Sequence, residues 1–372
     1  MRMFPKTLSA AASLALMAGA ASAQSSVTLY GDIDLYGNFM KSSSGNHILA
    51  LDDGAYLRSR WGLKGVEDLG GGYTAKFTLE GGIFSDTGSS AVNGILFDRQ
   101  SYLALGTPGA GEFRIGRQNG PIFFHGTYID FTARTLGSVI NAFGVPSRYD
   151  NDVSYISPRF SNMQFEGHVS LPESPVGNHP LVIQASLDYV TDNIVLGAMS
   201  LRGLPPTDPK VDEDVVYDNV YADWKYGKGT VYLAYVHSNN VTSSSVSNTA
   251  GTILGNTGGY NAGTNPDLNH FYDIWQVSAD YYVTPLLRVG ALWVRIIDTS
   301  GRDQGASGGS VGAYYDLSKR TTLYALADTI RNDANGGFRF AGSAGLKSNF
   351  TNPDDINGRT ISGLSIGAVH RF

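Results

Sequence analysis

Three basic residues in the stretch YLRSRWGLKG stand two or four positions apart. Arg58, Arg60 and Lys64 alternate there with the apolar residues Trp61 and Leu63. Side chains two residues apart lie on the same face of an extended strand, so this spacing predicts a ladder of positive charge along one face. Such a ladder does electrostatic rather than covalent chemistry, because fixed charges on low-dielectric walls create a field that attracts anions.

Covalent chemistry has little support in the sequence. The pentapeptide GLSIG (363–367) matches the Gly-x-Ser-x-Gly motif of hydrolases, but that motif needs a turn from strand to helix. Ser365 instead lies inside an alternating segment, too close to Phe372 for a helix to follow. There is no cysteine, and no two histidines have the spacing of metal ligands on a helix. We therefore expect no catalytic residue, no metal site and no cofactor.

Alternation of apolar and polar residues recurs along the whole chain. In VTLYGDIDLYGNF, Val27, Leu29 and Ile33 share one face, and Asp32 and Asp34 share the other. This period of two predicts strands with one apolar and one polar face. Sixteen segments show it, with approximate cores at 27–39, 55–66, 72–84, 95–106, 111–118, 148–157, 162–171, 179–190, 193–203, 214–226, 229–240, 270–283, 286–298, 307–317, 321–330 and 360–372.

The connections between these segments also alternate in length. One set is tight, at 67–72, 107–111, 158–162, 226–229, 284–285 and 318–320. The other set is longer and polar, at 40–54, 85–94, 119–147, 204–213, 241–269 and 331–359. Short turns at one end and long loops at the other are typical of outer-membrane barrels.

Periodicity alone allows two folds. In a soluble sandwich the apolar faces would meet in a shared core, whereas in a transmembrane barrel they would face lipid. Flanking aromatic residues, repeated charges on the polar faces and a strand at each end of the chain favour the barrel, because the last strand can then pair with the first and remove the free edges. We expect an all-β fold, a sixteen-stranded antiparallel transmembrane barrel.

The N-terminus resembles an export signal. Arg2 and Lys6 precede an apolar run, and Ala21-Ser22-Ala23 forms a small-residue cleavage site. We expect residues 1–23 to be a signal peptide and residues 24–372 to form a single barrel domain.

Composition narrows the class of partner. With 27 Lys and Arg against 33 Asp and Glu, the net charge is −6, and no block of basic residues stands out. We therefore expect no nucleic-acid partner. After the N-terminus, no apolar run approaches the roughly 18 residues of a transmembrane helix.

Several motifs resemble the general porins of Gram-negative outer membranes, in their beta-proteobacterial, Neisseria-like branch. They are SSVTLYGDIDLY, SRWGLKGVEDLGGGYTAKFTLEGG, FDRQSYLALGTPGAGEFRIGRQ, RYDNDVSYISPRF and the terminal HRF. The resemblance implies a homotrimer in outer-membrane lipid, with the third long loop folded inward as a constriction. It also implies that the terminal aromatic residue, Phe372, is the signal read by the barrel-assembly machinery.

Basic residues are expected to line the lumen of such a barrel. Alternation places Arg58, Arg60, Lys64 and Lys76 on its inner face, while Arg99 and Arg114 match family positions that carry pore arginines, and Arg148 begins the strand after the third loop. Strict alternation groups Arg117 with the outward residues Phe113 and Ile115, so the sequence does not decide whether Arg117 faces the lumen. Each of these bases has a plainer interpretation, a solvated charge or an ion pair with a nearby acid.

The third loop, 119–147, holds one acid, Asp130, and one base, Arg134, among many aromatic residues. Its length indicates a functional or a disordered loop, and its apolar residues indicate packing against the inner wall. We expect Asp130 to project toward the arginines across the opening. The alternative is that Asp130 caps a turn within the loop.

These features predict an outer-membrane channel for passive diffusion of small hydrophilic solutes and ions, with a modest preference for anions. A substrate-selective channel is a variant of the same class. A barrel hydrolase and a soluble sugar-binding sandwich are alternatives from other classes.

Overall fold

The computed structural model describes residues 26–138, 147–171, 181–204, 215–239, 271–340 and 348–372. The predicted signal peptide (1–23) lies outside these residues, as do parts of several long loops. Among the described residues, no helix has the length and apolar character needed to cross a membrane.

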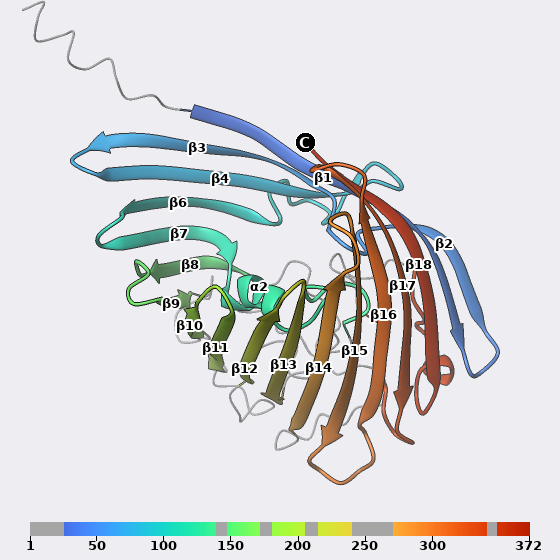
Figure 1. Cartoon of the computed structure of the whole chain (residues 1–372). Coiled ribbons are helices and arrows are strands. Elements are labelled where there is room, and N and C mark those ends of the chain that lie inside the picture. The colour runs from blue at the N-terminus through green and yellow to red at the C-terminus, as the bar shows by residue number, and fades with distance from the viewer. Residues whose placement is uncertain (1–25, 139–146, 172–180, 205–214, 240–270, 341–347) are drawn as a thin grey trace, which may run out of the picture.

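Sixteen antiparallel strands form a closed ring (Figure 1). Every strand pairs with its neighbours in the ring, and the last strand pairs with the first. The strands are β1 (Ser26–Ser42), β3 (Arg60–Gly70), β4 (Tyr73–Phe84), β6 (Gln100–Thr107), β7 (Gly111–Asn119), β8 (Arg148–Ile156), β9 (Met163–Ser170), β10 (Leu181–Val190), β11 (Ile194–Leu204), β12 (Val215–Tyr226), β13 (Gly229–Ser238), β14 (Tyr272–Tyr282), β15 (Leu287–Asp298), β16 (Ala306–Asp316), β17 (Thr321–Asn332) and β18 (Thr360–Arg371).

Among the described residues, five short elements lie outside the sixteen strands of the ring. Strand β2 (His47–Asp53) folds back onto β1, and β5 (Ser89–Ser90) pairs with the end of β4. Helix α2 (Pro121–His125) and the 3-10 turn η2 (Gly126–Tyr128) lie in the third loop, and a second 3-10 turn, η4 (Pro353–Asp355), precedes β18. In Figure 1, α2 lies within the curve of the sheet.

The two faces of the sheet differ as alternation predicts. Apolar side chains on the outer face are exposed, for example Leu103 at 69% and Ile115 at 65%. Polar side chains such as Asn38, Gln184 and Gln276 are buried on the inner face. In the described part of the chain, the exposed apolar residues of the outer face do not pack against a second sheet, so the barrel interpretation is confirmed and the sandwich is excluded. A separate cluster of buried apolar side chains includes Ile122, Phe131 and Leu136 of the third loop.

Two predicted strands begin later than expected. Residues 55–59 precede β3 without pairing, since the backbone amides of Tyr56 and Leu57 donate to the Asp34 carboxylate at 2.7 and 2.6 Å. Residues 95–99 precede β6, where the Asp98 carboxylate accepts the Gly82 amide at 2.6 Å. In both places a carboxylate thus accepts backbone donors that a strand ladder would otherwise use, and alternation does not reveal such contacts.

The seam between β1 and β18 joins the two ends of the described chain. Residues Asp32 to Ser42 pair in register with Arg371 to Ile361. At the end of this ladder, Gly31 and Phe372 exchange two backbone hydrogen bonds of 3.2 and 3.0 Å. The Phe372 ring lies directly over Gly31, where a Cβ atom would overlap it. The terminal aromatic residue therefore covers the seam where strand pairing ends.

This close approach predicts that Gly31→Ala destabilises the barrel, because the added methyl group meets both the Phe372 ring and the Arg60 carbonyl oxygen. Overpacking of this kind costs about 1–3 kcal/mol. The matched control is Gly37→Ala on the same strand, where the nearest atom to the new Cβ is 3.9 Å away. Heat modifiability on gels and refolding yield should fall for Gly31→Ala alone; equal behaviour of the two variants would contradict the close-contact explanation.

Candidate functional site

Five arginines gather on the inner face near the third loop. Arg58 precedes β3, Arg60 begins it, Arg99 precedes β6, Arg117 lies in β7 and Arg148 begins β8. Electrostatic interactions connect Arg58 with Arg99 and Arg117, and Arg148 with both Arg58 and Arg99. The structure thus brings four of the predicted residues together with Arg117. We call these five the arginine cluster.

Four acids neutralise most of the arginine cluster. Arg58 pairs with Asp98 at 2.8 Å, and Arg99 pairs with Glu80 at 2.6 Å. Arg60 pairs with Asp32 at 2.9 Å and lies 3.6 Å from Glu80. Arg117 pairs with Asp150.

Arg58 stays charged despite its burial. Burial lowers the pKa of Arg58 to about 10, with Asp98 opposing this shift and Arg99 adding to it. A pKa of about 10 lies well above neutral pH, so Arg58 holds a fixed positive charge.

A β-bulge decides the orientation of Arg117. The register between β7 and β8 jumps from Gly116↔Asp152 to Gln118↔Tyr149. Two residues of β8 therefore oppose Arg117, and one of them, Asn151, has a φ of +51°. A bulge re-aims a side chain locally, and Arg117 is buried and donates to the Asp98 carbonyl oxygen at 2.6 Å. Arg117 thus joins the cluster instead of the outer face.

The other predicted bases form a separate group along the wall. Lys76 and Arg114 both contact Glu112 at 2.6 Å, and Lys64 lies over the Tyr30 ring at 5.3 Å. Lys76 is four residues from Glu80 along β4, which corresponds to about 13 Å at 3.3 Å per residue. These three residues share the inner face with the arginine cluster but are displaced toward the short-turn end.

The third loop contacts the inner wall at many points. His125 contacts Tyr221 of β12 and lies 3.1 Å from the Ser186 hydroxyl of β10. Farther along the loop, the Ser310 hydroxyl of β16 donates to the Gly137 carbonyl oxygen at 2.9 Å. The Leu136 amide donates to the carbonyl oxygen of Ala55, just beyond β2. The described part of the loop is therefore held from several directions.

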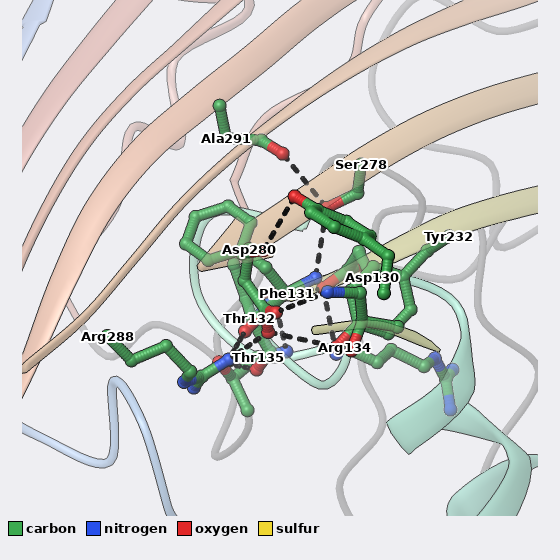
Figure 2. A network of polar contacts seen from close by, with 12 residues as sticks. Asp130, Phe131, Thr132, Arg134, Thr135, Tyr232, Ser278, Asp280, Arg288 and Ala291 are labelled. Atoms are coloured by element: carbon green, nitrogen blue, oxygen red, sulfur yellow. Dashed lines mark hydrogen bonds and ion pairs between the residues drawn. The ribbon is translucent and has the colours of Figure 1, made fainter. Parts of the chain in front are cut away.

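Phe131 is the central anchor of this loop (Figure 2). Its amide donates to the Ser278 hydroxyl at 3.0 Å, and its carbonyl oxygen accepts from Arg288 at 2.8 Å. The ring lies against Gly290 of β15 and near Gly312 of β16, where the wall has no side chain. The wall glycines thus form a recess that fits this ring.

Asp130 does not face the arginines, and that expectation is wrong. Its carboxylate is buried and accepts five hydrogen bonds. The donors are the Thr132 amide and hydroxyl, the Arg134 amide, the Ser138 hydroxyl and the Gln276 side chain, at 2.5–3.3 Å. The structure therefore shows the alternative, in which Asp130 caps a turn within the loop (Figure 2). Donors of the loop itself, and no arginine side chain of the wall, lie within hydrogen-bond distance of this carboxylate among the described residues.

The chain then turns sharply, since Ala133 and Arg134 have φ angles of +56° and +57°. A cavity of about 280 Å³ separates this turn from the arginine cluster. It is lined by Tyr56, Leu57, Arg60, Phe123, Thr127, Ala133, Arg134, Thr135, Ser147 and Arg148. We call it the loop cavity. Loop base Arg134 thus reaches the position that we expected an acid to occupy.

Comparisons with known proteins place this geometry in a family. A family model described as Gram-negative porin matches residues 10–335. An outer membrane porin protein of Bordetella pertussis is 39% identical over 178 residues, covering 43% of this chain and 46% of that protein. The major outer membrane protein P.IB of Neisseria meningitidis is 25% identical over 355 residues, covering 91% and 98% of the two chains. The chain thus matches under half the length of the Bordetella relative and nearly all of the Neisseria one.

Solved structures agree on the fold. An anion-selective porin from Comamonas acidovorans superposes with a TM-score of 0.75 at 22% identity, covering 94% of this chain and all of that one. A trimer form of OmpT from Vibrio cholerae gives a TM-score of 0.63 at 14% identity, covering 94% and 99%. With the matching family model, the closed sixteen-stranded ring and its polar interior, this chain is an integral outer-membrane protein that belongs to the Gram-negative porin family.

Proposed function

We propose that the protein is a water-filled channel for passive diffusion of small hydrophilic solutes and ions, with a modest preference for anions. Membership in the porin family and the polar inner face of the closed ring support a channel. An ion keeps much of its hydration in such a lumen, so wall charges act on it through their field.

The position of the third loop supports a narrowing of the lumen beside the arginine cluster. Its described residues contact β10, β12, β14, β15 and β16 from inside, which fixes its position in the lumen. We infer that solutes pass between this loop and the wall that carries Arg60 and Arg148.

The observation that carries the anion preference is a local surplus of positive charge. The arginine cluster and Arg134 supply six guanidinium groups, and their partners are four carboxylates. Among the described residues, neither Arg134 nor Arg148 has a carboxylate at ion-pair distance. Asp53 and Asp130 also interact electrostatically with Arg58 and Arg134, respectively, although they form no ion pair with them. Together with lining acids elsewhere, such as Asp34 and Asp223, and the net charge of −6, they keep the preference modest.

A hydrolase has no support in this part of the structure. Ser365 lies within β18, paired between Asn38 and Leu326, and no strand-to-helix turn surrounds it. We propose that the protein is not an enzyme. A substrate-selective channel is the variant of this function that the loop cavity supports.

Assembly follows the family pattern in this proposal. The exposed apolar outer face fits both lipid and neighbouring subunits, and a trimer form is known for the similar Vibrio protein. Phe372 at the seam fits a terminal signal that the assembly machinery reads before the ring closes.

Reconstitution in planar bilayers tests the channel itself. Purified protein should produce stepwise current increases, in groups of three for a trimer, and a reversal potential of anionic sign under a KCl gradient. An absence of current steps from correctly folded protein would refute the proposed function.

Arg148→Gln should lower the anion-to-cation permeability ratio, roughly two- to tenfold, because the local concentration of a counter-ion follows the potential steeply. The effect should shrink as salt rises from 0.1 to 1 M, where the Debye length falls from about 10 to 3 Å. Lys228→Gln, at an exposed short turn, removes the same charge outside the lumen and serves as the control. An unchanged reversal potential in an Arg134→Gln/Arg148→Gln double variant would contradict the charge-surplus argument.

Gly290→Ala should displace the third loop, because the new Cβ would overlap the Phe131 ring. We expect a changed single-channel conductance with more current noise. Gly363→Ala is the control on the inner wall, since its Cβ would meet Phe340 at an ordinary 3.5 Å. Quiet, wild-type currents in the Gly290→Ala variant would argue against Phe131 as the anchor of the loop.

Asp130→Asn distinguishes a loop-organising carboxylate from a charge facing the solute path. The structure predicts noisy currents and lower thermal stability, since weakening buried hydrogen bonds to a carboxylate costs about 1–3 kcal/mol. Quiet channels with a sharply higher anion preference would instead support the position facing the arginines.

A further inference from the structure

The loop cavity combines aromatic walls with guanidinium groups. Tyr56 and Leu57 come from the segment before β3, and Phe123 comes from α2. Arg60, Arg134 and Arg148 contribute the charged groups. An ordinary small-ion passage needs only charge and water, so the apolar part of this lining calls for a separate explanation.

Two of the guanidinium groups keep hydrogen-bonding capacity in reserve. Arg148 is 3% exposed and Arg134 is 9% exposed, yet Nε of Arg148 and Nη2 of Arg134 have no partner among the described residues. Their other contacts are to uncharged oxygens, since Arg148 donates to Ser147 at 3.1 Å and Arg134 to the Ile122 carbonyl oxygen at 3.4 Å. Each is a buried charge-assisted donor that lacks an acceptor.

The threonine hydroxyls of the cavity already donate their protons to carbonyl oxygens of the loop. The Thr127 hydroxyl donates to the Phe124 carbonyl oxygen at 2.9 Å, and the Thr135 hydroxyl donates to the Thr132 carbonyl oxygen at 2.6 Å. The free charge-assisted donors of the cavity are therefore the two guanidinium groups, which suit an anionic acceptor. Three guanidinium groups in the lining also repel a cation.

The aromatic part has a defined position relative to these charges. The guanidinium of Arg148 lies over the Phe123 ring at 5.0 Å, and the Tyr56 ring lies 4.8 Å from Tyr314 and 5.8 Å from Tyr324. These contacts hold the Phe123 and Tyr56 rings beside the donors. A planar ligand with a carboxylate at one end satisfies both halves, with its charge on the arginines and its ring against Phe123 and Tyr56.

We propose that the loop cavity is a transient binding site for small aromatic carboxylates on their way through the channel. This inference rests on the proposed function and adds a substrate class to it. The volume of about 280 Å³ lies just below the roughly 300–1,000 Å³ of pockets that hold drug-sized ligands, so it suits a single-ring compound such as benzoate. Weak binding at this position favours entry while still permitting release.

The test is the block of chloride current in planar bilayers by three probes, each added over the same range of concentrations. Benzoate carries both ring and charge, acetate carries only the charge, and benzyl alcohol carries only the ring. We expect benzoate to reduce the current at concentrations about tenfold lower than either of the others, in brief resolvable interruptions. Benzoate acting no more strongly than acetate would overturn the proposal.

Variants separate the two halves of the site. Phe123→Leu should raise the half-blocking concentration of benzoate several-fold and leave acetate unchanged, and Arg148→Gln should weaken both. Phe124→Leu is the matched control for the ring, because Phe124 neighbours Phe123 but does not line the cavity. Lys228→Gln is the control for charge. If Phe123→Leu and Phe124→Leu give the same block by benzoate, the cavity does not recognise the ring.

The failure of this inference and of the proposed function are distinguishable. If the channel conducts with anion preference but benzoate blocks it no better than acetate, the proposed function stands and the proposed substrate class is wrong. A protein that gives no current steps removes both.

Discussion

Backbone hydrogen bonding around a ring without a free edge is the constraint on which the rest of this structure depends. In hydrocarbon each unpaired amide or carbonyl group costs several kcal/mol, so a sheet survives there only when it closes. Pairing of β18 with β1 over eleven positions closes this sheet. The closed ring then fixes which face of each strand meets lipid and which meets water, and all luminal chemistry follows from that division.

Closure also creates the inner surface on which the third loop folds. A loop inside a barrel carries polar backbone groups into a confined space, and these need partners. Here Ser278, Arg288 and Ser310 of the wall supply donors or acceptors to the loop backbone, and Asp130 gathers the loop's own donors. The glycines of the wall matter as much as its polar groups, since the recess at Gly290 admits the Phe131 ring.

In the arginine cluster, ion pairs offset the cost of burying several guanidinium groups in the barrel wall. Buried charges are costly unless paired, and four of the five cluster arginines have a carboxylate partner. Such pairs hold the guanidinium groups in place but contribute little net field. In our proposal the field comes mainly from Arg134 and Arg148, which both line the loop cavity together with the aromatic rings of Tyr56 and Phe123. We propose that a passage with this combination would select solutes both by their charge and by the apolar group that carries the charge.

The sequence by itself determined the architecture, because period-two alternation and the lengths of the connections are local properties that each segment displays. It located all sixteen ring strands and the inward side of Arg60, Lys64 and Lys76. It missed β2, and it left Arg117 undecided, since the bulge opposite Arg117 depends on how β8 pairs and not on the residues of β7. The tertiary structure alone decided that Asp130 turns into its own loop and that Arg134 faces the cavity. Those outcomes depend on which donors from distant strands come within hydrogen-bond reach, and no spacing along the chain encodes such distances.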